Sequence, residues 1–186
     1  MKEEIAKAIE VLKAGGIILY PTDTVWGIGC DATNYEAVQK VYELKKNEDK
    51  KSMLVLVENL DKVMLYVDKV PSVAWDILEL TEKPTTLILP NAKNVAKNII
   101  PEEGTLGIRI PNHEFCKQLL FKFHRPLVST SANISGTPAP KKLKEVSKEI
   151  IDGVDMVINT KFEGQPTNRP SSIIMLDTNS RVKIIR

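Results

Sequence analysis

Short apolar segments alternate along this chain with segments whose apolar residues recur at helical spacing. Residues 17–20, 53–57 and 85–89 are runs of apolar, β-branched and aromatic residues, with the length and character of strands buried in a sheet. Residues 3–13 and 33–45 carry apolar side chains at every third or fourth position, the pattern of helices that pack through one face. Strands and helices interleaved in one chain predict an α/β (α+β) fold, with helices packed on a sheet.

The same two patterns continue through the rest of the chain. Further strands are predicted at 105–111, 126–128, 156–158, 172–176 and 182–185, and further helices at 63–66, 73–80, around 115–120 and at 143–151. Thr33 and Glu36 have the spacing of a capping box, which predicts that a helix begins after Thr33. No repeat and no shift of composition divides the chain, so we expect a single domain over residues 1–186.

The composition is that of a globular protein with a core, since 42% of the 186 residues are hydrophobic and 27% are charged. This mixture excludes a disordered or fibrous chain. The net charge of +2 is too small to predict nucleic-acid binding, so local groups have to hold any polyanion. No apolar run has the length of a membrane span and no signal peptide is recognisable, so we expect a cytoplasmic protein.

Several common catalytic arrangements have no counterpart in the sequence. Cys30 and Cys116 have no Cys or His at metal-ligand spacing, so we expect both to pack in the core. His113 and His124 adjoin no Ser or Cys nucleophile motif and form no zinc-binding pair on a helix. Neither a P-loop nor a Gly-x-Gly-x-x-Gly turn follows a strand, so a nucleotide would occupy an unconventional site.

Two predicted strands run directly into loops rich in Thr, Ser, Asn and Gly. Ligands of α/β sheets bind where strand ends open into loops, so residues 21–31 and 129–136 are candidates for a binding site. The loop 129–136 supplies neutral donors that suit anionic oxygens, without the acid and base of a Ser-His-Asp triad. Ordinary polar turns, in which Thr22 and Thr24 cap backbone groups, have the same composition, so both interpretations stay open.

Two cationic features have a binding and a structural interpretation. Arg109 lies in the predicted strand 105–111, where a buried guanidinium is costly unless it meets a carboxylate or phosphate. A ligand anion and a structural pair with Asp or Glu both satisfy that requirement. The lysine-rich run 45–51 suits phosphates, although a solvated charged surface is the commoner meaning of such a run.

Five segments, taken together in chain order, carry a specific resemblance. They are Tyr20-Pro21-Thr22-Asp23-Thr24-Val25-Trp26-Gly27-Ile28-Gly29-Cys30-Asp31, Leu44-Lys45 with Lys51-Ser52-Met53, Gly107-Ile108-Arg109-Ile110-Pro111 with His113, Ser129-Thr130-Ser131-Ala132-Asn133-Ile134-Ser135-Gly136, and Arg169-Pro170-Ser171-Ser172-Ile173-Ile174. Over nearly its whole length the chain resembles the short, single-domain type of the YrdC family of threonylcarbamoyl-AMP synthases. The resemblance implies a YrdC-like twisted mixed sheet with surrounding helices and an open concave substrate cavity.

The resemblance also implies a reaction. L-threonine, bicarbonate or CO2, and magnesium-bound ATP would give threonylcarbamoyl-AMP and pyrophosphate for the threonylcarbamoyladenosine modification of tRNA. In this nucleotidyltransferase chemistry the amine attacks CO2 or an activated carbonate, and the carbamate oxygen then attacks the α-phosphorus. Positioning and charge stabilisation matter more there than a protein nucleophile, so we expect no catalytic nucleophile. Transferase proteins of tRNA modification are the expected partners, together with a contact to RNA, and no membrane is involved.

The matching motifs imply two groups of binding residues. The threonine-binding group is Thr24, Arg109, Ser129 and Ser171. The ATP-binding group is Lys45, Lys51, Thr105, Ser131, Asn133 and Arg186. Arg109 is expected to clamp the threonine carboxylate, and Lys45 and Lys51 are expected to contact phosphates. No acidic cluster indicates a metal cage, so Mg2+ is expected to enter on the triphosphate.

Two segments depart from the family pattern. Asn47 stands where family members usually have an arginine, which predicts a lower affinity for ATP unless nearby lysines supply the charge. Residues 82–86 keep a proline, Pro84, and a final threonine, Thr86, but lack the glycine that many relatives have there.

Two other functions compete with the synthase interpretation. A nonenzymatic RNA-binding protein would also use a basic cavity, but the small net charge and the aromatic content of 5% argue against it. A carbamoyl-handling domain, like the YrdC-like unit of hydrogenase maturation factors, is the third possibility. That unit normally belongs to a much longer chain.

Overall fold

The computed structural model describes residues 1–46 and 53–186. Its helices are α1 (Lys2–Lys13), α2 (Tyr35–Lys45), α3 (Leu60–Tyr66), α4 (Ser72–Leu80), α5 (Glu114–Phe123) and α6 (Lys148–Gly153). Its strands are β1 (Ile18–Tyr20), β2 (Gly27–Gly29), β3 (Leu54–Leu56), β4 (Thr85–Leu89), β5 (Leu106–Arg109), β6 (Leu127–Ser131), β7 (Met156–Val157), β8 (Ser172–Leu176) and β9 (Val182–Ile184). Short 3-10 turns lie at Lys97–Ile99, Leu143–Glu145 and Thr160–Phe162.

The described strands form one mixed sheet in the order β7-β1-β2-β6-β3-β5-β4-β8-β9. Three neighbouring pairs are parallel, namely β1 with β7, β3 with β5, and β4 with β8. The other pairs are antiparallel. This order places β2 beside β6, where Gly27 faces Ser131 across the ladder. Two of the segments that the sequence marks as polar loops are therefore neighbours in the sheet.

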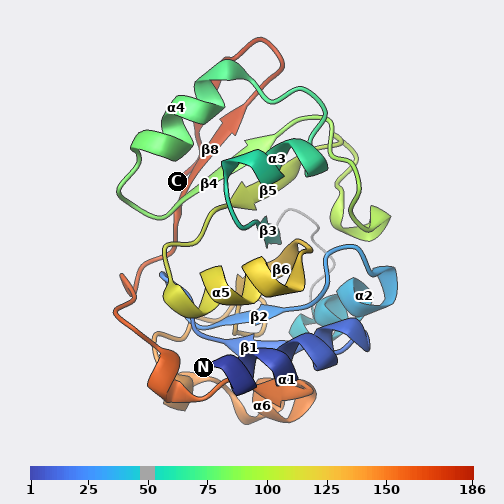
Figure 1. Ribbon diagram of the computed structural model, residues 1–186, viewed down its shortest axis with the longest axis vertical. Helices are drawn as coiled ribbons and strands as arrows, with labels where there is room; N and C mark the ends of the chain where they lie inside the picture. Colours follow the sequence, from blue (N-terminus) through green and yellow to red (C-terminus); the bar gives the residue numbers. More distant parts are fainter. Residues whose placement is uncertain (47–52) are drawn as a thin grey trace.

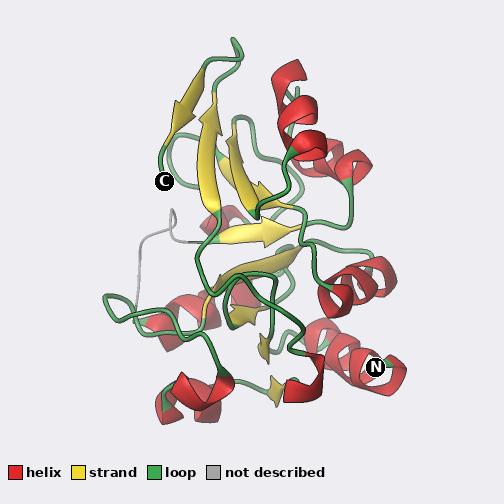
Figure 2. Ribbon diagram, turned by 90° about the vertical axis from the view of Figure 1, so that its left-hand side faces the viewer, coloured by secondary structure: helices red, strands yellow, loops and turns green. Residues whose placement is uncertain are grey.

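The helices divide between the two ends of the sheet. Figure 1 shows α3 and α4 beside β4, β5 and β8 in the upper part, and α1, α2, α5 and α6 around the strands of the lower part. In the view turned by 90°, the upper helices lie to the right of their strands and the C-terminus lies to the left (Figure 2). Within the described residues, α3 and α4 thus cover one face of β4, β5 and β8.

Alternate side chains of β4 point to opposite faces of the sheet, as the pleat of a strand requires. Leu87 and Leu89 are fully buried in the apolar cluster that also contains Ala74 of α4. Thr86 and Ile88 line a cavity on the opposite face. Strand β8 repeats this alternation beside β4. One face of these strands therefore stabilises the fold and the other forms a wall of the cavity.

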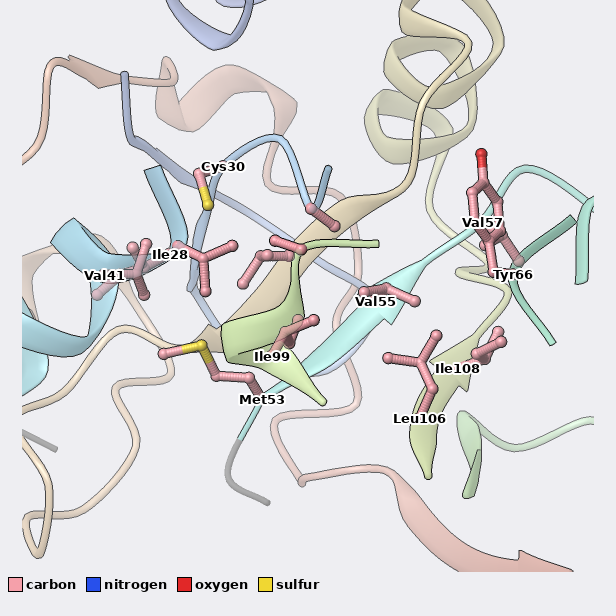
Figure 3. Close-up of a cluster of buried hydrophobic side chains, with 14 of the residues drawn as sticks. Ile28, Cys30, Val41, Met53, Val55, Val57, Tyr66, Ile99, Leu106 and Ile108 are labelled. Carbon is pink, nitrogen blue, oxygen red and sulfur yellow. The ribbon is translucent and has the colours of Figure 1, made fainter. Parts of the chain in front are cut away.

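The main apolar cluster joins strands from both ends of the sheet. Figure 3 shows Val55 of β3 and Ile108 of β5 in this cluster with Ile28 of β2 and Cys30. Cys116 is buried in a second cluster, which α1 and α5 form with β1. Both cysteines are free, and burial raises the pKa of each thiol above its ordinary value, which disfavours the reactive thiolate. The packing role predicted for them is confirmed.

Residues 21–31 are not one continuous loop, contrary to the sequence-based prediction. Gly27–Gly29 forms strand β2, which pairs with both β1 and β6. Glycines are poor strand formers, so the local pattern gives no strand signal there, and the two neighbouring strands supply the hydrogen bonds. Strand β6 likewise extends to Ser131, because Ser129 pairs with β3 and Thr130 with β2.

Two helix boundaries also differ from the predictions. Helix α2 has Asn34, not Thr33, as its N-cap, since the Asn34 side chain accepts from the Ala37 N–H at 3.0 Å. The helix predicted over 143–151 is a 3-10 turn followed by α6, which begins after Ser147. Among the described residues, no helix is both long and apolar enough to cross a membrane.

Candidate active site

A cavity of about 710 Å3 lies against the uncovered face of β4, β5 and β8 and extends to β6. This volume is within the range of small-molecule sites, which is about 300–1,000 Å3. The predicted site residues that line it are Thr24, Thr105, Arg109, Ser129, Ser131, Asn133, Ser171 and Arg186. Lys45 is not among the lining residues, and Lys51 and Asn47 lie outside the described residues. The structure therefore brings members of both predicted groups to one cavity.

Arg109 ends strand β5 with its side chain almost completely buried. Its Nη2 lies 3.4 Å from Oδ1 of Asp23, and its Nη1 donates to the Thr24 hydroxyl at 3.1 Å. Oδ2 of Asp23 accepts from the Asn112 N–H at 3.1 Å, which fixes the carboxylate. A structural pair with an aspartate, one of the two interpretations, is thus confirmed. Because Arg109 also lines the cavity, the pair holds the guanidinium in position beside any ligand there.

The turn that carries Thr24 is fixed by its own hydroxyl groups. The Thr22 hydroxyl donates to the carbonyl of Val25 at 2.7 Å and accepts from the Thr24 N–H at 3.1 Å. The two threonine hydroxyls lie 2.9 Å apart. The backbone-capping interpretation is therefore correct for Thr22. Both threonines also line the cavity, so the cap and a binding role are compatible.

Ser129 lies where β6 meets the cavity, and a buried tyrosine holds its side chain. The hydroxyl of Tyr20, from β1, donates to Oγ of Ser129 at 2.9 Å. Tyr20 is fully buried, and this burial raises the pKa of its phenol well above the ordinary value. The phenol therefore stays protonated and remains a donor to Ser129.

We expect Tyr20→Phe to lower the free energy of unfolding by about 1–2 kcal/mol, because it leaves the buried Ser129 hydroxyl without this donor. Urea denaturation of the wild type and the variant measures the change. Tyr35→Phe is the matched control, since Tyr35 is exposed, and its effect should stay within about 0.5 kcal/mol. Equal midpoints for Tyr20→Phe and the wild type would contradict the expected role of this hydrogen bond.

Ser171 and Arg186 form the wall of the cavity beside β8. The Ser171 hydroxyl lies 2.8 Å from the hydroxyl of Thr86 on β4. The guanidinium of Arg186 donates through Nε and Nη2 to the carbonyl of Ser171, at 3.1 and 3.0 Å. These contacts join Arg186 to the segment that leads into β8. Both Ser171 and Arg186 line the cavity.

Lys45 is the last residue of α2 and only 3% exposed. Its ammonium group donates to the carbonyl of Ser131 at 2.5 Å and to the carbonyl of Asn133 at 2.6 Å. Burial lowers the pKa of Lys45 from its ordinary value to about 8. The structure thus places this ammonium behind the loop that carries two predicted ATP-binding residues.

Several residues that hold the site together were not among the predicted binding residues. Trp26 donates through its indole N–H to Oε1 of Glu163 at 2.6 Å, and a ring nitrogen of His113 lies 3.0 Å from the Glu163 carbonyl. The Thr167 N–H donates to the carbonyl of Asp23 at 2.9 Å. These contacts attach the segment before Ser171 to the turn of Thr24. Asp23 and Trp26 lie within two residues of Thr24 in the sequence, which is a usable signal, whereas nothing in the local sequence marks Glu163.

No group of three or more His, Cys, Asp or Glu side chains that would hold a metal ion occurs in the described part of the chain. Among the described residues that line the cavity, Glu103 is the acidic one. The donors around the cavity are instead hydroxyl, amide and guanidinium groups. Such donors suit anionic ligands, including a metal-bound phosphate chain.

A family model described as telomere recombination, for the Sua5/YciO/YrdC domain, matches residues 10–186. The chain belongs to the Sua5/YciO/YrdC family. Among its curated relatives is the threonylcarbamoyl-AMP synthase of Pseudoalteromonas translucida, which is 33% identical over 172 residues. That match covers 91% of this chain and 91% of the relative. The family predicted from the five motifs is thus confirmed.

Solved structures of the Sua5/YciO/YrdC family have the same fold. P. abyssi Sua5 complexed with L-threonine matches with a TM-score of 0.88 and 26% identity over 98% of this chain. This chain spans 53% of the length of that protein. E. coli YciO matches with a TM-score of 0.86 and 24% identity, covering 100% of this chain and 89% of YciO. The predicted mixed sheet with surrounding helices is confirmed.

Proposed function

We propose that this protein is a threonylcarbamoyl-AMP synthase, which makes threonylcarbamoyl-AMP and pyrophosphate from L-threonine, bicarbonate or CO2, and ATP. The observation that carries the proposal is the meeting of Thr24, Arg109, Ser129 and Ser171 with Ser131 and Asn133 around one cavity. Relatives of nearly the same length have this name. The cavity volume is sufficient for a nucleotide and an amino acid side by side.

Threonine would bind where Arg109 and Thr24 meet. A guanidinium fixed by Asp23 presents a planar set of donors to a carboxylate, and the Thr24 hydroxyl lies beside it for the amine or the side chain. The P. abyssi Sua5 structure, which contains L-threonine, supports an amino-acid site in this fold. Ser129 and Ser171 would supply the remaining donors.

ATP would bind on the side of Ser131, Asn133, Thr105 and Arg186, with its phosphates toward the polar loop that follows β6. We propose that Mg2+ enters the cavity bound to the triphosphate, because the cavity wall offers neutral and cationic donors rather than a set of carboxylates. Lys51 is proposed as a phosphate contact from its sequence alone, since it lies outside the described residues.

The reaction requires positioning more than a protein nucleophile. The threonine amine attacks CO2 and loses a proton to give a carbamate, whose oxygen attacks the α-phosphorus as pyrophosphate leaves. Arg109 would hold the carboxylate end of threonine, so that the carbamate faces the nucleotide. Cationic and hydroxyl donors would stabilise the charge on the transferring phosphoryl group. This is nucleotidyl transfer, and a partner transferase that acts on tRNA, in the cytoplasm, would consume the product.

The test is mass spectrometry of the purified protein incubated with ATP, bicarbonate and Mg2+, with and without L-threonine. We expect threonylcarbamoyl-AMP and pyrophosphate in equal amounts, and neither when threonine is omitted. A folded sample that binds ATP but forms no product would contradict the synthase function. Salt-sensitive binding of tRNA without nucleotide turnover would favour the nonenzymatic alternative instead.

A further inference from the structure

Lys45 makes an unusual set of contacts for a lysine beside an anion-binding cavity. Its ammonium group donates to two backbone carbonyls of one loop, at Ser131 and Asn133. The backbone carbonyl of Lys45 also accepts from the Ser135 N–H at 3.0 Å. The end of α2 therefore holds the same short loop at three points.

The buried position of Lys45 favours hydrogen bonds to the loop over contact with solvent or a ligand. The residue is 3% exposed and does not line the cavity, whereas Ser131 and Asn133 do. A buried ammonium needs acceptors for its N–H groups, and the two carbonyls accept from two of the three. Lys45 is also the last residue of α2, where the helix dipole favours a positive charge.

We infer that Lys45 is a positioning residue, which fixes residues 131–135 against the end of α2 and so determines the shape of one wall of the cavity. Its effect on a ligand passes through the loop. A wall held in this way keeps the Ser131 and Asn133 side chains in place before the ligand arrives, which lowers the cost of ordering them. The ligand part of this inference rests on the proposed function, because it assumes that ATP binds beside this loop.

The neighbouring lysine provides a matched control. Lys46 has the same chemistry and the next position in the chain, but its ammonium group pairs with Glu149 at 2.7 Å on an exposed surface. Replacing Lys46 removes one positive charge near the cavity without removing a contact to the loop. The pair of variants thus separates the loss of charge from the loss of the hydrogen bonds.

The experiment is hydrogen–deuterium exchange of the nucleotide-free protein, combined with calorimetric titration of MgATP, for the wild type, Lys45→Met and Lys46→Met. We expect Lys45→Met to raise the exchange rate of residues 131–137 by about tenfold or more, since hydrogen bonds from a charged donor are lost. ATP binding should weaken in parallel. Lys46→Met should leave the exchange rate unchanged and alter ATP binding by less than about threefold.

The outcomes distinguish positioning from direct phosphate contact. Weaker ATP binding with unchanged exchange of 131–137 would overturn the inference and make Lys45 a phosphate ligand. Unchanged exchange and unchanged binding would overturn it as well. If Lys45→Met does not fold, Lys45→Gln provides the comparison, because a neutral amide keeps N–H donors on a shorter side chain and should give an intermediate exchange rate. Failure of the wild type to bind ATP would contradict the proposed function, while the exchange rates would still test the positioning role.

Discussion

Arg109→Ala should raise the KM for threonine by at least about 30-fold, with a far smaller effect on the KM for ATP. Loss of a charged, hydrogen-bonded partner from a buried site costs about 2–5 kcal/mol, and each 1.4 kcal/mol is about tenfold in affinity. The guanidinium is held by Asp23 and Thr24 at the proposed threonine end of the cavity, so the loss of affinity should affect threonine. Steady-state kinetics with each substrate varied in turn measures both effects.

Arg109→Ala also leaves Asp23 buried without its cation, so the variant must be shown to fold. Arg109→Lys keeps the charge but loses the planar donors, and we expect it to fold and still to bind threonine weakly. Arg125→Ala is the matched control, because Arg125 pairs with Asp31 at 2.7 Å but does not line the cavity. Equal losses for threonine and ATP in a folded Arg109 variant would contradict the carboxylate role.

Gly29→Ala should destabilise the fold by about 3 kcal/mol, at the upper end of the usual cost of overpacking a core. An added Cβ would lie 2.6 Å from the carbonyl oxygen of Val128 and 2.7 Å from the ring of Tyr20. Neither neighbour has room to move, since one is sheet backbone and the other is fully buried. For a chain of this length we expect the melting temperature to fall by about 6–12 °C, as measured by calorimetry.

Gly27→Ala, two residues earlier on the same strand, is the control. Its nearest contacts would lie at 3.3 Å or more, so we expect a much smaller loss of stability. Gly27 lines the cavity, and its added methyl group would lie 3.5 Å from the Thr22 side chain and 3.6 Å from the Ser129 hydroxyl. Activity should therefore fall while the fold persists. Equal melting temperatures for the two variants would contradict this account of β2.

The sequence was sufficient for the layers of the fold, and most of the binding residues predicted from it line the cavity. Apolar runs and helical spacing mark elements that bury one face, and these elements occur where they were predicted. Strand β2 is the element that was missed altogether, because its pairing comes from β1 and β6 and not from the propensities of Gly27 and Gly29. A strand of this kind is recognisable only once its neighbours are in place.

The roles of individual side chains were harder to predict than their locations. Arg109 was placed correctly in a buried strand, and a pair with an acidic residue was one of two open interpretations. Asp23, its partner, is 86 positions away in the sequence, and no local pattern links the two. Lys45 lies in a motif of the family, yet its residue type alone does not reveal that its acceptors are backbone carbonyls. Partners distant in sequence become visible only in the folded chain.

The alternation along β4 and β8 separates two kinds of change at neighbouring positions. Along each strand, one residue faces the apolar cluster and the next faces the cavity. Substitutions at Thr86, Ile88, Ile173 and Met175 therefore alter the size and polarity of the ligand space while the opposite face keeps its packing. A chain with this arrangement is able to change what it binds, one residue at a time, on strands whose other side continues to stabilise the same fold.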